Sequence, residues 1–329
     1  MQRDTAQEIE SLRAFISNSG ASDGTHLMAE VERREGTENL ARVRGSRTAE
    51  MVAATRAGHH ARAERPLIVE DPYAIHLVGE RWQRVIGSSW RHWLITRVLL
   101  RKVIPTTTFV LIRARFTDDR ILAAADRGIR QLVILGAGFD TFALRYPDLG
   151  IQVFEVDLAA SAALKQERLA AADIPVPEHL HFVNVDFERD SLGERLTVAG
   201  FDPGEPAFFS WMGVTFYLAR EAVTGTLLGV GGIAARGSEL AFDYMNSRDC
   251  VPESELALFD SLLGLVKKHG EPMITHFDPT AVVEQLGLAA DWEVLEHDFP
   301  ADNPRRYLGA RTDVPRVAPL FRLLHLRRR

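Results

Sequence analysis

Short apolar runs alternate with stretches of helical periodicity through most of the chain after residue 108. The run Leu132–Leu135 has no polar alternation, which is typical of a strand buried on both faces of a parallel sheet. Further strands are predicted at residues 152–157, 181–186, 206–214, 238–245, 292–299 and 320–326. Helices are predicted at residues 109–125, 159–172, 191–198, 219–235 and 278–286. This alternation predicts an α/β fold with right-handed connections.

The first hundred residues contain helical patterns and no strand pattern. Residues 6–16 have the apolar spacing of a short amphipathic helix. Residues 46–62 form another helical pattern, and Asp71-Pro72 is expected to start a further helix with proline in its first turn. The predicted organisation is an N-terminal helical arm and cap over residues 1–105, followed by the α/β domain over residues 106–329. A helical lid insertion is expected at about residues 246–277 of that domain.

A glycine-rich loop follows the first apolar run, with Gly136, Ala137 and Gly138 ahead of Asp140. Glycine allows a sharp backbone turn and the close approach of a ligand. The second strand pattern ends in Asp157, 19 positions after Gly138. In doubly wound folds such an acid binds a ribose hydroxyl. These features predict a cofactor that contains a nucleoside, bound at the carboxyl edge of the sheet.

The loop departs from the dinucleotide fingerprint at Thr141, because G-x-G-x-x-G places its third glycine there. The charge of Asp140 would also repel a pyrophosphate. S-adenosylmethionine (SAM) carries no phosphate, and its ammonium and sulfonium groups favour nearby acids. The loop therefore favours SAM, and an NAD-dependent oxidoreductase is the less favoured alternative.

Composition limits the classes of partner. The 329 residues are 46% hydrophobic, with a mean hydropathy of −0.08 and a net charge of −6, as in an ordinary globular protein. The basic run Arg327–Arg329 is expected to be a solvated tail, so nucleic acid is not an expected partner. The single cysteine and the absence of zinc-ligand spacing predict no metal. No signal peptide or bilayer-spanning run is visible in the sequence, so we expect a cytoplasmic monomer or homodimer without a membrane partner.

Several motifs occur along the chain in a specific order. They are T-A-x-x-V-A-A-x-R-A from Thr48, D-P-x-A from Asp71, R-A-R-F-T-D-D from Arg113, Q-L-V-I-L-G-A-G-F-D-T from Gln131, V-F-E-V-D from Val153, F-S-W-M-G-V-T-F-Y-L from Phe209, F-D-Y from Phe242 and G-E-P from Gly270. With this ordered set, the chain resembles the leucine carboxyl methyltransferase-like family of class I SAM-dependent methyltransferases, in its bacterial small-molecule branch. The resemblance extends from about Ser46 to the carboxyl terminus.

The resemblance implies a Rossmann-like, mostly parallel sheet of seven strands whose last strand is antiparallel, with an N-terminal helical cap and a helical insertion. It implies that Arg113 binds the SAM carboxylate, that Asp157 holds the ribose, and that Asp186 and Phe187 bracket the adenine. Some members carry a glutamate that faces the SAM ammonium where this chain has Met212. The implied cofactor contacts are Arg113, Gly136, Ala137, Gly138, Asp140, Asp157, Leu158, Asp186, Phe187, Trp211 and Met212.

The expected function is methyl transfer from SAM to a carboxylate, phenolic or hydroxyl oxygen of a small aromatic or carboxylic molecule in secondary metabolism, with S-adenosylhomocysteine (SAH) as product. A carboxylate needs no general base, whereas a hydroxyl usually does. The candidate bases are His59, His76, His181 and Tyr217. Because none of these is marked out as the base, a SAM- or SAH-binding protein with little methylation activity, or with other SAM chemistry, stays open as an alternative.

Overall fold

The computed structural model describes residues 48–329 apart from residues 95–103, 187–189, 269, 289 and 312. The described residues belong to one compact unit. The helix expected at residues 6–16 and the predicted adenine contact Phe187 lie outside the described residues. The division between cap and α/β domain at residue 105 stays a prediction.

Helices occupy the described part of the chain before the sheet. They are a helix over residues 48–62, η1 (Ala74–Leu77), α3 (Glu80–Ile86), α4 (Ser89–Leu94) and α5 (Ile104–Asp126). Strands and helices then alternate as β1 (Gln131–Leu135), α6 (Phe142–Arg145), β2 (Gln152–Asp157), α7 (Ala159–Ala171), β3 (Leu180–Asn184), α8 (Leu192–Val198), β4 (Ala207–Trp211), η3 (Thr215–Tyr217), α9 (Arg220–Ile233) and β5 (Glu239–Met245). The last elements are η4 (Arg248–Cys250), η5 (Glu253–Glu255), α10 (Leu256–Lys268), α11 (Val282–Gln285), β6 (Trp292–Asp298), α12 (Arg305–Leu308) and β7 (Phe321–Arg328).

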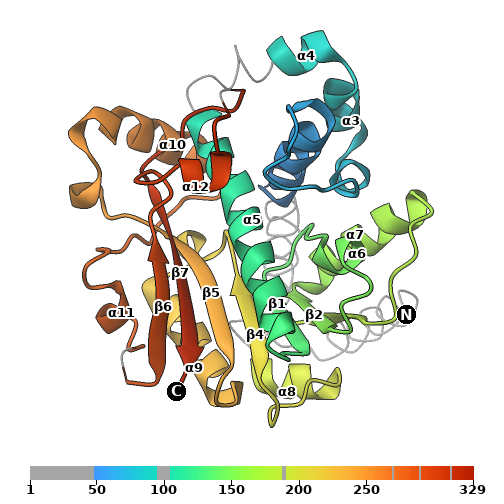
Figure 1. The fold of residues 1–329 in the computed structure, drawn as a ribbon, viewed down its shortest axis with the longest axis vertical. Coiled ribbons are helices and arrows are strands. Elements are labelled where there is room, and N and C mark those ends of the chain that lie inside the picture. Colours follow the sequence, from blue (N-terminus) through green and yellow to red (C-terminus); the bar gives the residue numbers. More distant parts are fainter. Residues whose placement is uncertain (1–47, 95–103, 187–189, 269, 289, 312) are drawn as a thin grey trace, which may run out of the picture. The chain divides into compact units, whose positions relative to one another are not determined.

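The seven strands form one sheet in the order β3-β2-β1-β4-β5-β7-β6. Strands β1 to β5 pair in parallel, and β7 runs antiparallel to both of its neighbours, β5 and β6. The expected mostly parallel seven-stranded sheet with an antiparallel last strand is therefore confirmed (Figure 1). Strands β1 and β4 are adjacent, but the chain leaves β1 towards one edge of the sheet and leaves β4 towards the other. Doubly wound folds bind their ligands at the carboxyl ends of the strands where the strand order reverses in this way.

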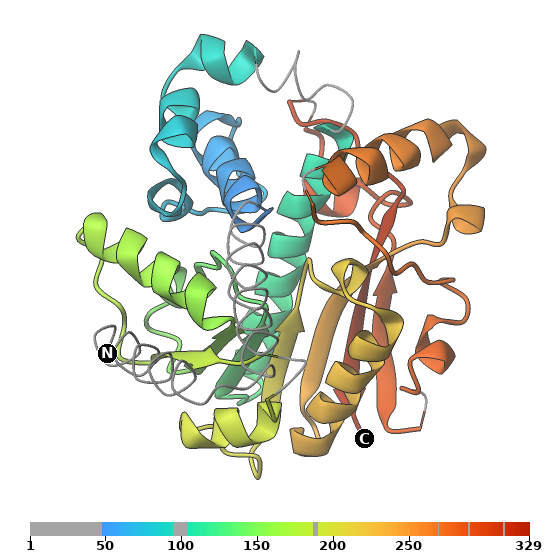
Figure 2. The ribbon, with the colours of Figure 1, turned by 180° about the vertical axis from the view of Figure 1, so that it is seen from behind.

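The sheet lies between two layers of helices. Alternate residues of the strands face opposite sides, as in β1, where Leu132 and Ile134 pack with α5, α6 and α10. Val133 and Leu135 pack with α8, α9 and α11 on the other side. In Figure 1, α5 crosses in front of the strands, and Figure 2 shows α9 covering the opposite face. Burial on both sides explains why the strand sequences are continuous apolar runs.

The cap helices have a small hydrophobic core of their own. Alanines of the helix over residues 48–62 pack with η1 and α3, and three residues of the α/β domain complete this core: Phe139, Leu144 and Leu169. Phe139 belongs to the glycine-rich loop after β1, so the apolar contacts of the cap reach directly to that loop. Arg168 of α7 adds a cation–π contact, with its guanidinium carbon 4.7 Å from the centre of the Phe139 ring.

Three local expectations are corrected. The terminal arginines are not a solvated tail, because β7 includes Arg327 and Arg328, which pair with Glu239 and Asp291. The segment after Asp71-Pro72 forms only a short 3-10 turn, because the Asp71 side chain bonds the backbone locally. The helix expected at residues 278–286 is limited to α11, since Asp278 instead caps a turn at Thr280. In each case a specific polar contact overrides the sequence pattern.

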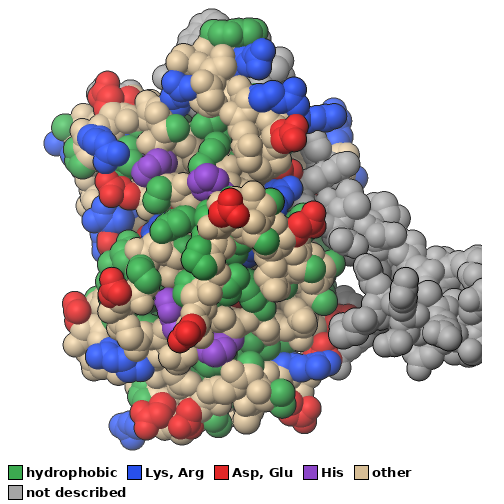
Figure 3. All heavy atoms as spheres, turned by 90° about the vertical axis from the view of Figure 1, so that its right-hand side faces the viewer, with side chains coloured by type: hydrophobic (Ala, Val, Ile, Leu, Met, Phe, Trp, Pro, Cys, Tyr) green, Lys and Arg blue, Asp and Glu red, His purple; other side chains and the backbone are tan. Residues whose placement is uncertain are grey.

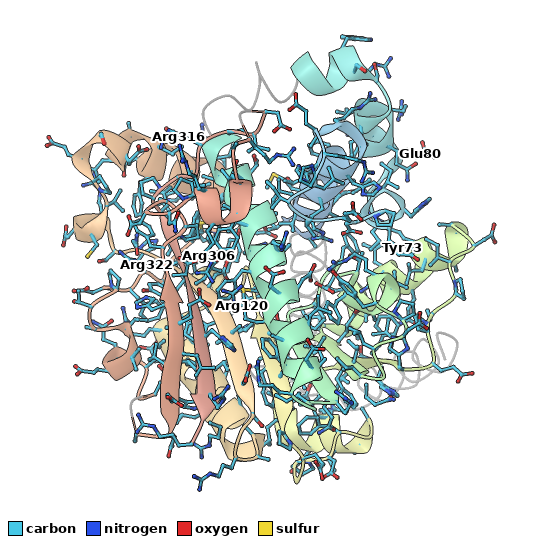
Figure 4. All side chains as sticks on the ribbon, in the orientation of Figure 1. Tyr73, Glu80, Arg120, Arg306, Arg316 and Arg322 are labelled. Atoms are coloured by element: carbon cyan, nitrogen blue, oxygen red, sulfur yellow. The ribbon has the colours of Figure 1, made fainter. Side chains whose placement is uncertain are left out.

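Charged side chains also tie the helices to the far end of the sheet. Arg120 of α5 and Arg306 of α12 both pair with Glu296 of β6 (Figure 4). Figure 3 shows acidic and basic side chains interspersed over the described surface of one side of the molecule. No helix among the described residues has the length and apolar character needed to cross a membrane.

The buried carboxylate of Glu239, at the amino end of β5, is the basis of a prediction about stability. Its carboxylate, 1% exposed, accepts hydrogen bonds from Arg127 at 2.6 Å and 2.8 Å and pairs with His325 and Arg327. Burial opposes its charged form, but the bonds from His325 and Arg127 outweigh burial and lower the pKa of Glu239. Glu239→Gln should lower the free energy of unfolding by about 2 kcal/mol, because it removes the charge of a buried acceptor that His325 and the half-exposed Arg127 and Arg327 bind.

Urea unfolding at pH 7 measures this loss. The matched control is Glu205→Gln, since Glu205 is an exposed glutamate just before β4. A loss in Glu239→Gln no larger than in this control would contradict the prediction.

Candidate functional site

The glycine-rich loop after β1 is held by backbone and side-chain bonds from β2. The N–H groups of Gly136 and Ala137 donate to the carbonyl of Val156 at 2.8 Å and 3.1 Å. Gly138 N–H donates to Asp157 Oδ2 at 2.6 Å, and Leu158 N–H donates to Oδ1 at 2.7 Å. Asp157 therefore sets the position of the loop as well as standing at the edge where a ribose would bind.

Both predicted glycines of this loop adopt positive φ angles, +67° at Gly136 and +51° at Gly138. A Cβ on Gly136 would lie 2.6 Å from Cγ2 of Val214, and one on Gly138 would lie 3.2 Å from Cβ of Ala49. Glycine is required here by conformation and by space. These contacts also place the loop directly beside the segment after β4 and the first turn of the helix over residues 48–62.

The two residues that distinguished this loop from a dinucleotide fingerprint have defined structural roles. The Asp140 carboxylate accepts a bond of 2.7 Å from Phe142 N–H at the start of α6. Thr141, 1% exposed, donates its hydroxyl to Asp71 at 2.8 Å. Beneath the loop, Lys165 donates to the carbonyl of Asp140 at 2.6 Å and pairs with buried Glu155. Burial raises the pKa of Glu155 to about 7, against the opposing charge of Lys165.

Arg113 of α5 lies at the carboxyl ends of β4 and β5. Its guanidinium pairs with Asp243 at 3.2 Å, and the other oxygen of Asp243 accepts a bond of 2.6 Å from Gly213 N–H. A Cβ on Gly213 would lie 2.6 Å from Nη1 and Nη2 of Arg113, so only glycine lets the guanidinium fit against this turn. Burial raises the pKa of Asp243, against the opposing charge of Arg113. Arg113, which the resemblance implies to bind the SAM carboxylate, is thus a largely buried and oriented cation.

Tyr217, Thr48 and Glu271 meet beside this ion pair. Thr48 Oγ1 donates to the Glu271 carboxylate and also bonds the Tyr217 hydroxyl. The segment that carries Glu271 follows η3 through bonds such as Ile274 N–H to the carbonyl of Phe216, at 2.7 Å. Burial raises the pKa of Tyr217, and the nearby carboxylates add to this effect although Arg113 opposes it.

We call Thr48, Arg113, Tyr217, Asp243 and Glu271 the carboxyl-edge cluster. Residue-by-residue reasoning gave no role to Thr48, Asp243 or Glu271, although each belongs to one of the ordered motifs. Their contacts join positions 130 and 223 residues apart in the chain. The motifs were therefore the only signal in the sequence that could have pointed to these residues.

The other expected cofactor contacts take different positions. Leu158 follows Asp157 and is exposed. Asp186 follows β3 and its N–H donates to Asp190 at 2.9 Å. Trp211 is fully buried on the α9 side of the sheet, whereas Met212 is half-buried on the α5 side. Only Met212 of this pair lies on the same face as Arg113.

The three histidine candidates lie apart from the carboxyl-edge cluster. His59 is buried, and its Nε2 accepts a bond of 2.9 Å from Ile68 N–H. His76 is exposed in η1. His181 stands near the start of β3, bonds Gln152 at 2.8 Å and stacks on Phe154, towards the amino end of the sheet. Of the four candidates, only Tyr217 is brought to the cluster.

The fold resembles that of two solved structures, one of them described as a candidate methyltransferase. The crystal structure of a candidate methyltransferase from Thermobifida fusca YX superposes with a TM-score of 0.52 at 16% identity, over 78% of this chain and 93% of that one. A DUF574 family protein from Streptomyces avermitilis gives 0.53 at 13% identity, over 84% and 97%. At such identities the likeness shows the fold alone, which is that of the class I methyltransferases.

Sequence comparison identifies the family. The profile of the leucine carboxyl methyltransferase family matches residues 49–231. The candidate SAM-dependent methyltransferase YktD of Bacillus subtilis (strain 168) is 28% identical over 80% of this chain and 91% of its own length. A similarly named protein of Mycolicibacterium paratuberculosis is 35% identical over 60% and 65%. The chain belongs to the leucine carboxyl methyltransferase family of class I methyltransferases, whose cofactor is SAM.

The bond from Ile68 N–H to His59 predicts a pH dependence of stability. Burial, with a contribution from the charge of Arg311, lowers the pKa of His59 from 6.5 to about 4. Between pH 6.5 and pH 4 the unfolded chain therefore binds a proton that the folded chain does not, and stability falls as pH falls. At pH 5 this loss should reach about 2 kcal/mol. Urea unfolding of wild type and His59→Gln at pH 7 and pH 5 measures it; equal pH dependence in both would refute the assignment.

Asp157 supplies a test of the ribose contact. Asp157→Ala should weaken SAH binding by roughly tenfold or more, because it removes both the acceptor for the ribose and the bond to Gly138 N–H. Isothermal titration measures the affinity, and thermal melting verifies folding. Asp157→Asn keeps an oxygen acceptor and should therefore lose less SAH affinity. The matched control is Asp148→Ala, because Asp148 is an exposed acid before β2. Unchanged affinity in Asp157→Ala would remove this residue from the cofactor site.

Proposed function

We propose that this protein transfers a methyl group from SAM to an oxygen of a small molecule, and that the acceptor is a carboxylate or an acidic phenol. The observation that carries the proposal is the position of the carboxyl-edge cluster. Val214 and Ala49, which touch the glycine loop, adjoin Gly213 and Thr48 in sequence. An oriented arginine and a tyrosine hydroxyl are therefore brought beside the loop at the end of β1.

The residues present suit SAM. The positive φ angles of the glycine loop leave backbone, and no Cβ, facing a ligand at the switch between β1 and β4. The carboxylate of Asp157 has lone pairs beyond its two backbone bonds for ribose hydroxyls. Arg113 offers a planar guanidinium for the methionine carboxylate while it stays paired with Asp243. Leu158 and Asp186 are proposed to contact the adenine.

The alternatives are less well supported. A dinucleotide would need a small residue where Thr141 is buried and hydrogen-bonded to Asp71. Met212 supplies no acid for the ammonium of SAM, and Asp140 already caps α6. A SAM-binding protein without turnover therefore remains the competing proposal, and an assay with acceptors separates the two.

The candidate bases favour an acceptor that is already anionic. His59 uses Nε2 to bond the backbone, and the other two histidines lie away from the cluster. Because burial raises its pKa, Tyr217 stays a neutral phenol at neutral pH and serves as a hydrogen-bond donor. A carboxylate or acidic phenol needs no proton removed before it attacks. Tyr217 would orient the acceptor oxygen by turning its O–H from Thr48 to that oxygen.

The chain supplies alignment and exclusion of water. Bound SAM supplies an electrophilic methyl group on a sulfonium. The Thr48–Glu271 bond joins the first turn of the helix over residues 48–62 to the segment around Glu271. The cap and the insertion therefore meet at the carboxyl-edge cluster. Holding the acceptor oxygen in line can contribute roughly 7–11 kcal/mol to lowering the barrier. We infer that the cap helices described over residues 48–94 and the insertion at 246–277 shape the acceptor site.

A binding and turnover experiment tests the proposal. The purified protein should bind SAH at micromolar concentrations by isothermal titration and should not bind NADH. With labelled SAM, transfer is expected to carboxylic acids or phenols rather than to aliphatic alcohols. Tyr217→Phe should lower kcat by roughly tenfold, since one hydrogen bond is lost, with SAH affinity unchanged.

Three outcomes would contradict it. Binding of NADH but not SAH would overturn the assignment of SAM as the cofactor. Binding of SAH without methyl transfer to any acceptor of a broad panel would support a SAM-binding protein without turnover. Equal turnover in Tyr217→Phe would remove the tyrosine from the acceptor site.

A further inference from the structure

A buried charge network links the cap to the cofactor loop. One oxygen of Asp71, Oδ2, accepts bonds of 2.8 Å from Arg56 Nε and from Thr141 Oγ1. The other, Oδ1, accepts from the N–H groups of Tyr73 at 3.2 Å and Ala74 at 3.0 Å. Asp71 is 1% exposed, and each of its oxygens thus accepts two bonds within the described part of the chain.

The network continues on both sides of Asp71. Arg56 also donates to the carbonyl of Phe139 at 2.5 Å, within the glycine loop. Thr141 accepts a bond of 3.0 Å from Arg145 Nε, and Arg145 forms a two-pronged pair with Asp118 of α5. We call Arg56, Asp71, Asp118, Thr141 and Arg145 the Asp71 network. It places two arginines against two carboxyl groups; burial raises the pKa of Asp118, and the charge of Arg145 opposes that rise.

The charge state of the network is maintained by its own contacts. Burial would raise the pKa of Asp71, but Arg56, Arg145 and the bonds from Arg56 and Thr141 outweigh it and lower the pKa. The carboxylate is therefore ionised at neutral pH. An ionised, desolvated acceptor makes strong and directional bonds, which resist displacement of any donor. Movement of the loop relative to the cap would break such bonds.

We propose that Asp71 is a positioning residue for the cofactor: it holds the Gly136–Thr141 loop in its binding conformation from the cap, without itself touching the cofactor. The proposal rests on the proposed function for the identity of that cofactor. Two bonds reach the loop, one from Thr141 directly and one from Arg56 to the Phe139 carbonyl, on either side of Asp140. Because the loop and the cap share these bonds, binding of the cofactor and order in the cap are coupled.

Thr141→Val and Thr141→Ser form the matched pair of variants. Valine keeps the shape but removes the hydroxyl that bonds Asp71, whereas serine keeps it. Thr141→Val should weaken SAH binding by roughly tenfold, the effect of a charge-assisted hydrogen bond, and Thr141→Ser should bind as wild type does. Asp71→Asn should weaken binding at least as much, if it folds. Arg127→Gln removes an ion pair with the buried carboxylate of Glu239 at the amino edge of the sheet, away from the loop, and controls for general loss of stability.

Amide hydrogen exchange without ligand is the second readout. The N–H groups of Gly136, Ala137, Gly138 and Asp140 are hydrogen-bonded, so they should exchange slowly in wild type and Thr141→Ser. These N–H groups should exchange faster in Thr141→Val, and their exchange in Arg127→Gln should be as slow as in wild type.

The outcomes separate the two proposals. Unchanged SAH affinity and loop exchange in Thr141→Val, with only a lower melting temperature, would show a merely structural contact and overturn the positioning role. If wild type binds no SAH, the proposed function fails. In that case faster exchange of the loop in Thr141→Val still supports the positioning role of Asp71, and unchanged exchange overturns that role. Equal loosening of the loop in Arg127→Gln would also overturn it.

Discussion

The desolvated carboxylate of Asp71 is the constraint on which the arrangement of cap and loop depends. A buried anion is tolerated only when donors surround it, and here the donors come from the cap helix, from the turn after Pro72 and from the loop after β1. None of these segments can move alone without leaving a buried charge uncompensated. The short 3-10 turn at η1 and the buried Thr141 both follow from the same demand.

The part of the fold with strong local signals was predictable from the sequence. The continuous apolar run of β1, the glycines behind it and the acid at the end of β2 each have a local physical cause, and all three lie where expected. The antiparallel β7 came from the family resemblance. Arg327 and Arg328 could not be placed from local pattern, because β7 pairs with β5 and β6 and the two side chains bind Glu239 and Asp291, which lie far from them in the sequence.

The candidate site divides in the same way. Asp157 and the glycines could be named from spacing, since consecutive βα units bring their ends together. The meeting of Thr48, Tyr217 and Glu271 could not, because it depends on how the cap and the insertion fold over the sheet. The role of His59 was equally hidden: a histidine on a helix gives no sign that its ring accepts a backbone N–H group across a turn.

The packing of Phe139 has a consequence for exchanging parts among relatives. This side chain belongs to the cofactor loop by sequence but to the cap by its contacts. A chimera that takes a foreign cap to acquire a new acceptor would therefore have to accommodate the Phe139 ring and provide counterparts of Arg56 and Asp71. The cap and the glycine-rich loop are separate segments of the chain but share one hydrophobic core, and this junction limits how freely the cap can be exchanged.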